Sequence, residues 1–278
     1  MWIAGFADDI SGLVDTCCPN VMRATMTILS EEFKEFFSAQ GLKVNGEKEE
    51  HITWAKSPAH RAEVSLEGRD SAAQLKLLGV TVDNSYSFMP HAVAVTRKMM
   101  ARVSYLYRIR ENVTEKVLRM ITLSLICSLY RYCLEITGRA PAVQKYLQRT
   151  LNIVLRVATW GTRDTPVYRM LDEMKALNVA NEHKLACVMS LYRLMNTGSS
   201  ALEIELIRDK KEHSYATRNN SIYCKWQPLS ARGENSHIKV SVGIYNMLGI
   251  HKQSFLDKKE YTDGTTNLIK LAFGNSNL

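Results

Sequence analysis

The first third of the chain alternates short apolar runs with turn signals. Apolar runs at residues 1–6 and 10–14 flank Ala7-Asp8-Asp9, which predicts a β-hairpin with both carboxylates at its tip. Pro19 then suits the first turn of a helix, and Gly41 suits a helix stop. The apolar residues between these two recur at helical spacing: Met22, Met26, Leu29, Phe33, Phe36 and Phe37.

Short strands are predicted to follow this helix. Residues 42–44, 51–55, 63–66 and 75–82 are brief segments rich in branched and aromatic side chains, as is typical of strands. Asn45-Gly46 is a turn signal between the first two. These residues are therefore predicted to form a small antiparallel sheet accompanied by one helix.

The spacing of apolar residues becomes helical from about Pro90 onward. A first helix is predicted with one buried stripe, made of Ala92, Thr96, Met99, Val103 and Leu106. A second helix, over residues 117–132, is apolar nearly all round, so we expect it at the centre of a bundle. Thr114 is its predicted cap.

Three more helices are predicted before an irregular tail. The third ends before Trp160-Gly161, Thr165-Pro166 opens the fourth, and the fifth stops at Gly198. The tail has several turn signals and brief apolar patches, so we expect loose strands, a short helix or two and partial disorder. The chain is thus predicted to be an α+β protein in three parts: residues 1–88, 89–198 and 199–278.

The overall charge favours acidic partners. Lys and Arg total 36 against 28 Asp and Glu in 278 residues, a net charge of +8, which suits nucleic acid. The longest apolar stretch, residues 121–130, is too short for a bilayer, and Asp8-Asp9 interrupts the run that a secretory signal needs. We therefore expect an intracellular protein, nuclear or cytoplasmic, that is neither secreted nor bound to a membrane.

Several kinds of chemistry find no support in the sequence. The six cysteines include no C-x-x-C pair, so neutral thiols in a reducing compartment are expected and a structural zinc is not. The seven histidines are dispersed, and neither a P-loop nor a G-x-G-x-x-G turn is present. Nucleotide hydrolysis and dinucleotide redox chemistry are therefore not predicted.

The predicted hairpin tip is a candidate metal site. Asp8 and Asp9 could both supply carboxylate oxygens to Mg²⁺, as two-metal phosphoryl transfer requires. Asp is also a common residue of exposed structural turns, and that simpler role stays open on the spacing alone.

The helical region carries the second candidate site. Residues 97–156 contain twelve Lys and Arg against three Glu, a net charge of +9. On the first helix the side chains opposite the apolar stripe are Arg97, Lys98, Arg102, Tyr105 and Arg108; on the third, a polar ridge is formed by Lys145, Arg149, Asn152 and Arg156. Such ridges can track a phosphate backbone, although a solvated helix face is the alternative. Tyr105 could stack on a base or pack.

The order of these segments resembles the C-terminal half of a reverse transcriptase from a non-LTR (LINE-type) retrotransposon. Residues 5–10, Gly-Phe-Ala-Asp-Asp-Ile, resemble the catalytic [YF]-x-D-D hairpin called motif C. Residues 41–50 resemble motif D, with Lys48 at the family's lysine position. Residues 77–83 with Phe88 and His91 resemble the L-G-V-x-x-D strand and its continuation, the primer grip, which places Leu78, Gly79 and Val80 there.

The resemblance continues into the helices and the tail. Gln148-Arg149 with residues 163–166 resembles a thumb pattern, and Arg218-Asn219 and residues 245–248 resemble the segment after the thumb. The resemblance implies a palm-like sheet, a helical thumb and a post-thumb segment. It also implies Mg²⁺ on Asp8 and Asp9, Lys48 as a general acid toward pyrophosphate, and an RNA template or RNA–DNA hybrid as partner.

The family's fingers and motifs A and B have no counterpart in this sequence. Motif A supplies a further metal-binding aspartate, and Asp15 is too close to the hairpin to serve. We therefore expect a truncated RNA-directed DNA polymerase that is inactive alone, with Mg²⁺ useful only when an upstream polymerase portion supplies the missing parts. Two alternatives are a non-catalytic RNA- or DNA-binding module that uses the basic helices, and an unselected transposon relic.

Overall fold

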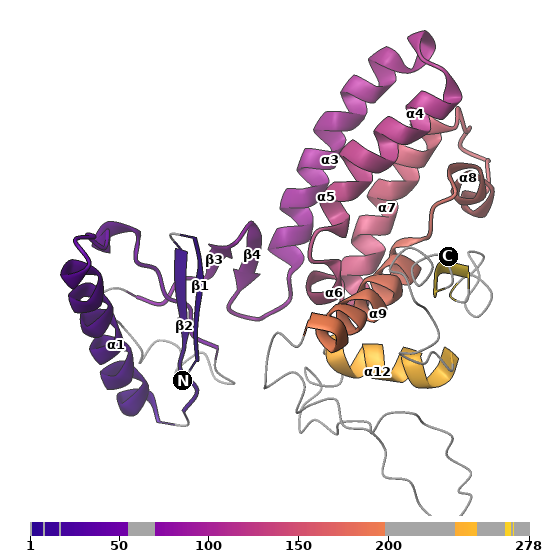
Figure 1. Ribbon diagram of the computed structural model, residues 1–278. Coiled ribbons are helices and arrows are strands. Elements are labelled where there is room, and N and C mark those ends of the chain that lie inside the picture. Colours follow the sequence, from indigo (N-terminus) through magenta and orange to yellow (C-terminus); the bar gives the residue numbers. More distant parts are fainter. Residues whose placement is uncertain are drawn as a thin grey trace, which may run out of the picture. The chain divides into compact units, whose positions relative to one another are not determined.

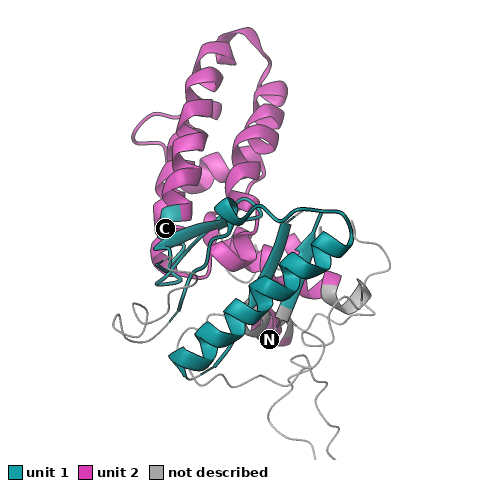
Figure 2. Ribbon diagram, turned by 90° about the vertical axis from the view of Figure 1, so that its left-hand side faces the viewer, with its two compact units in different colours: residues 1–90 teal, residues 91–278 magenta. Residues whose placement is uncertain are grey.

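The chain divides into two compact units, residues 1–90 and residues 91–278 (Figure 2). The computed structural model describes residues 2–7, 9–16, 18–54, 70–197, 237–248, 265–267 and 269. The first unit combines two small β-hairpins with a long helix, and the second is helical in the residues described. The predicted α+β class is confirmed.

The first hairpin lies where the sequence predicts it. Strand β1 (Trp2–Phe6) pairs antiparallel with β2 (Asp9–Leu13), and Phe6 lies opposite Asp9. This register leaves a two-residue turn, and Ala7 adopts a positive φ of 53° there, as such turns require. The hairpin is confirmed, but Asp9 begins a strand and does not belong to the turn.

Helix α1 (Pro19–Ala39) also matches its predicted ends. Proline occupies its first turn, and Gly41 follows it with a φ of 74°. The Leu42 amide donates to the Phe37 carbonyl at 2.8 Å, which closes the helix with the bond pattern that a left-handed glycine allows.

The predicted strands after α1 are only partly formed. Residues 42–44 and 51–54 are not strands, while residues 55 and 63–66 lie outside the described residues. Two isolated hydrogen bonds hold residues 51–54 instead. The Ala72 amide donates to the His51 carbonyl at 2.9 Å, and the Thr53 amide donates to Ser71 Oγ at 2.8 Å. A strand needs a continuous ladder, which two such bonds do not make.

The single strand predicted over residues 75–82 is wrong, because a turn divides it. Strands β3 (Gln74–Leu77) and β4 (Val80–Asp83) form a second antiparallel hairpin. Leu78 and Gly79 connect them with φ values of 46° and 87°. Two central residues at positive φ make the tight turn whose twist matches that of the paired strands.

The second unit is built on three long helical segments that run alternately up, down and up (Figure 1). Helix α3 (Met89–Ile109) ends in the short 3-10 helix η2 (Arg110–Asn112). The descending segment comprises α4 (Glu115–Ile121), a π-helical stretch η3 (Thr122–Cys127) and α5 (Ser128–Arg131). After the short α6 (Leu134–Thr137), helix α7 (Pro141–Ala158) ascends beside them. The three helices predicted for this stretch are confirmed.

The remaining described helices complete this unit. They are α8 (Val167–Met174), α9 (Val179–Thr197) and α12 (His237–Leu248). Helix α8 begins one residue later than predicted, because Pro166 takes the capping position and the Thr165 hydroxyl accepts from the Thr162 amide at 2.9 Å. Helix α12 packs on α9, where Ser241 Oγ donates to the Cys187 carbonyl at 2.6 Å (Figure 1).

The core of the second unit lies between these helices. Its fully buried side chains include Met99, Leu106, Leu118, Ile126, Tyr130, Leu134, Leu151, Leu155 and Met170. The predicted stripe on α3 is buried at Ala92, Met99, Val103 and Leu106, as expected from its spacing. No described helix has the length and apolar character needed to span a membrane.

Candidate nucleic-acid interface

Helices α3 and α7 touch through two threonines. The hydroxyls of Thr96 and Thr150 lie 3.3 Å apart, so each residue marks the side of its helix that faces the other helix. Both helices ascend in the same direction (Figure 1). The direction of every other side chain around the two helix axes follows from this contact, because each residue is rotated by about 100° from the one before it.

Five cations fall on one side of the layer that α3 and α7 form. Arg97 is one residue after Thr96, and Arg149 is one residue before Thr150. Because the helices are parallel and face each other, a rotation of about 100° forward on α3 and about 100° backward on α7 directs both side chains to the same side of the layer. Counting about 100° per residue from the two threonines directs Arg108, Lys145 and Arg156 to that side as well. We call Arg97, Arg108, Lys145, Arg149 and Arg156 the basic face.

The other predicted residues of α3 point elsewhere. Lys98 and Tyr105 lie roughly opposite Thr96 and are directed away from α7, both exposed. Arg102 is on the far side of the layer, where its guanidinium donates to the carbonyl of Leu125 in η3. The predicted set on α3 therefore does not act as one surface.

The basic face forms no ion pairs with carboxylates in the part of the chain that is described. Arg97, Arg108, Lys145 and Arg149 are exposed, and none forms an ion pair with a described carboxylate. Arg156 is half-buried, since its Nη1 donates to the Asn152 carbonyl at 3.2 Å and its Nε to the Thr162 carbonyl at 3.3 Å. Four cations are thus free to meet a polyanion, while Arg156 also holds the loop after α7.

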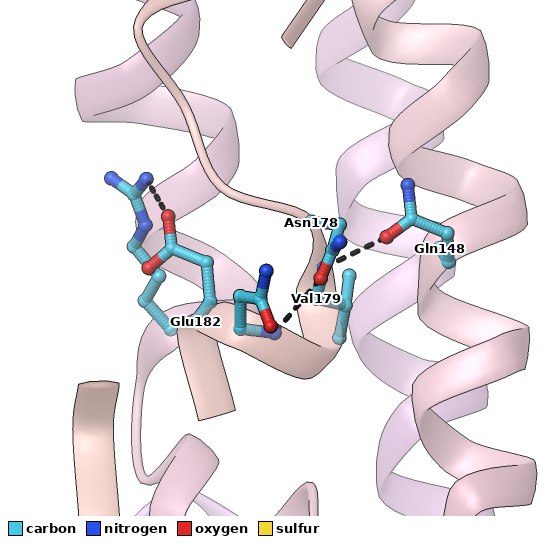
Figure 3. Close-up of polar contacts among 6 residues, drawn as sticks. Gln148, Asn178, Val179 and Glu182 are labelled. Carbon is cyan, nitrogen blue, oxygen red and sulfur yellow. Dashed lines mark hydrogen bonds and ion pairs between the residues drawn. The ribbon is translucent and has the colours of Figure 1, made fainter. Parts of the chain in front are cut away.

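The neighbouring residues Gln148 and Arg149 have separate roles. Gln148 Oε1 accepts from the Val179 amide at 2.8 Å, and Asn178 Oδ1 accepts from the Asn181 amide at 2.8 Å, so both side chains cap the start of α9 (Figure 3). Gln148 is buried, whereas Arg149 is exposed. Of these two neighbours, only the arginine is exposed for binding.

Another cation of this region is used inside the protein. Arg131 Nη2 lies 2.5 Å from Glu182 Oε1, and this partly buried ion pair links α5 to α9 (Figure 3). Burial also raises the pKa of the Cys127 thiol to about 11 and that of the Cys187 thiol to about 12. Both thiols are therefore neutral, as expected, and the described cysteines, Cys18, Cys127, Cys133 and Cys187, are unpaired.

The predicted catalytic residues lie in the first unit. Asp9 is exposed at the start of β2, and Lys48 is exposed at the end of the 3-10 helix η1 (Gly46–Lys48), while Asp8 lies outside the described residues. Ser30 Oγ donates to Glu49 Oε1 at 2.7 Å, which fastens the residue after Lys48 to α1.

The described residues do not by themselves make a metal centre. They contain no group of three or more His, Cys, Asp or Glu side chains placed to hold an ion. The accessible carboxylate of Asp9 is a chemically suitable oxygen ligand for Mg²⁺, but a stable site needs further ligands. The magnesium site stays a prediction.

The predicted primer-grip residues form the turn of the second hairpin. Leu78 and Gly79 are its central residues and Val80 begins β4; Leu78 and Gly79 are exposed. The hairpin ends at Asp83, whose buried carboxylate accepts from the amides of Ser87 and Phe88 at 3.0 and 2.8 Å.

Hydrogen bonding controls the charge of Asp83. Burial alone would raise the pKa of this carboxyl, but bonds from the Ser85 hydroxyl and from the amides of Ser87 and Phe88 outweigh it and lower the pKa. The Asp83 carbonyl also accepts from Trp54 Nε1 at 3.0 Å. In this hairpin Asp83 is structural, organising the segment that leads to α3.

The sequence interpretation missed one cluster. Trp160 is half-exposed, and its ring lies against the guanidinium of Arg110. The same guanidinium also lies over the ring of Tyr107. No sequence pattern indicates this arrangement, because fifty residues separate Arg110 from Trp160.

Part of the chain is similar to a known protein. Over 185 residues the chain is 29% identical to the "Probable RNA-directed DNA polymerase from transposon BS" of Drosophila melanogaster. The alignment includes 61% of this chain and 20% of the relative, so the chain spans about a fifth of that protein's length. No family model and no solved structure matches. The chain is therefore related to a transposon reverse transcriptase.

Proposed function

We propose that this chain is a non-LTR reverse-transcriptase-type polypeptide whose helical unit holds nucleic acid on the basic face of α3 and α7. The observation that carries this proposal is the convergence of cations from two helices on one side of their layer, without acidic partners among the described residues.

Electrostatics favours a polyanion on this surface over solvent alone. Like charges gathered on one side repel one another, and a ligand that brings phosphates relieves this repulsion and releases its own counterions. Contacts of this kind recognise the backbone and not the bases, so binding should be tolerant of sequence. By relation to an RNA-directed DNA polymerase, the proposed ligand is an RNA template or an RNA–DNA hybrid.

Catalysis is the second part of the proposal. Asp8 and Asp9 would hold Mg²⁺ and Lys48 would serve the leaving group once the rest of a polymerase palm is supplied. When bound, the metal would neutralise charge on the reacting phosphates. The 278-residue polypeptide alone should bind nucleic acid without extending a primer, because two carboxylates leave the reacting groups poorly positioned.

Binding by matched variants tests the first part. Anisotropy of a labelled RNA–DNA hybrid is measured at several salt concentrations for the wild type, R97A/R149A and K116A/R119A. Both variants remove two positive charges, but Lys116 and Arg119 lie on α4. We expect R97A/R149A alone to reduce the slope of log affinity against log salt by roughly two.

Equal losses in the two variants would show that only total charge matters and would contradict a basic face. Hybrid binding by the wild type that does not weaken between low and high salt would contradict phosphate contacts altogether.

A further inference from the structure

Arg110 contacts two aromatic rings at the C-terminal ends of α3 and α7. Its Cζ atom is 4.1 Å from the ring centroid of Tyr107 and 4.1 Å from that of Trp160. A planar guanidinium gains from such contacts because the ring faces are negative. We call these three residues the aromatic stack.

The donors of Arg110 are uncommitted in the described residues. Its Nε is buried without a hydrogen-bond partner, and no described carboxylate forms an ion pair with it. Buried donors are normally satisfied, so an orphaned one calls for an explanation. Since Nε is buried, the N–H groups of the two Nη atoms are the ones suited to donate to an oxyanion beside the rings.

The rings themselves remain accessible. Tyr107 is 56% exposed and Trp160 49% exposed, although the guanidinium covers one face of each. Trp160 also has a φ of 57°, a conformation that bulky residues seldom adopt and that is often found at binding sites. The Gly161 amide, bonded to the Arg156 carbonyl at 3.0 Å, holds this turn in place.

We propose that the aromatic stack binds single-stranded nucleic acid. An unpaired base would stack on the exposed face of Trp160, and an adjacent phosphate would accept from Arg110. A duplex cannot use the site in this way, since its bases already stack on one another. The inference rests on the proposed function and adds a second binding site to it. The basic face binds the backbone of a duplex, and the aromatic stack binds an unpaired segment.

The test compares two ligands on the full chain. Labelled 20-nucleotide single-stranded RNA and a blunt RNA–DNA hybrid of the same length are titrated into the wild type, W160A, W160F and R97A/R149A. We expect W160A to weaken binding of the single strand by on the order of tenfold while leaving the hybrid unchanged. W160F, which keeps an aromatic ring, should retain most of the affinity, and R97A/R149A should chiefly weaken the hybrid.

Fluorescence provides a readout that does not depend on a destabilising variant. A base stacked on Trp160 quenches its emission, so single-stranded RNA should quench the wild type clearly more than W160F. Equal quenching, or equal loss of both ligands in W160A, would overturn the inference. If the wild type binds the hybrid but not the single strand, only this inference fails. If it binds neither, the proposed function fails as well.

Discussion

The carboxylate of Asp83 accepts a hydrogen bond from the Phe88 amide at 2.8 Å and thereby closes the segment that joins the second hairpin to α3. This segment contains two aromatic residues at positive φ, Tyr86 at 57° and Phe88 at 58°. Such conformations are unfavourable for bulky residues, so the bonds of Asp83 are needed to hold them.

Removing this carboxylate should therefore destabilise the first unit. D83A leaves the amides of Ser87 and Phe88 without their acceptor, which should lower the free energy of unfolding by about 1–3 kcal/mol. Urea unfolding followed by tryptophan fluorescence measures the change, with D70A as a control, since Asp70 is exposed. Equal stabilities of D83A and D70A would show that the strained segment does not depend on this carboxylate.

The same group predicts a defined dependence on pH. Because the folded-state pKa of Asp83 lies below its ordinary value of 3.8, its contribution is fully present above that value and is lost as the pH falls through the folded pKa. The difference in unfolding free energy between wild type and D83N should therefore be constant from neutral pH to about pH 5 and shrink below pH 3.8. A difference that stays constant at every pH below 3.8 at which the protein remains folded would contradict the assignment.

Single cations on α3 should differ according to the side they face. Arg97 belongs to the basic face, whereas its neighbour Lys98 is directed away from α7. R97A should reduce the salt slope of hybrid binding by about one, and K98A should leave it nearly unchanged. Anisotropy titrations at several salt concentrations compare the two, with melting temperatures as a check on folding. A larger effect from K98A would place the ligand on a different side.

The ion pair between Arg131 and Glu182 should contribute to stability and not to binding. E182Q leaves the Arg131 guanidinium, whose side chain is 35% exposed, without its carboxylate, and because solvent screens part of that charge the protein should be destabilised by roughly 1–2 kcal/mol. Thermal unfolding of E182Q is compared with that of E173Q, in which the lost carboxylate is exposed. Replacing both partners, as in R131M/E182L, should recover part of the loss, because no unpaired charge remains.

Catalytic inactivity is a separate expectation. With primer, template, nucleotides and Mg²⁺, the purified 278-residue polypeptide should give no extension above that of D8N/D9N. Gel analysis of a labelled primer detects this at high sensitivity. Extension by the wild type that the double substitution abolishes would show that the chain already holds a working metal site.

Local patterns predicted most of the elements. The helices α1, α3 and α7 follow from apolar residues at helical spacing with proline near the start, and the first hairpin from two apolar runs around a polar turn. The wrong predictions concern short strands. Residues 42–44 and 51–54 are not strands, and the turn at Leu78-Gly79 divides the strand predicted over residues 75–82. Strand pairing depends on partners distant in sequence, which local composition does not specify.

The sequence by itself determined the charge of the helical region, the periodicity of its helices and the resemblance to reverse transcriptases, because each depends on residues close together in the chain. Tertiary structure alone decided how these residues are used. The contact of Thr96 with Thr150 sets which cations share a side, and packing turned Gln148 and Arg131 inward. It also brought Trp160 onto Arg110 across fifty residues of sequence. Helical spacing defines the directions of side chains around one helix axis. Only the packing between helices defines which side chains of two helices point to the same side.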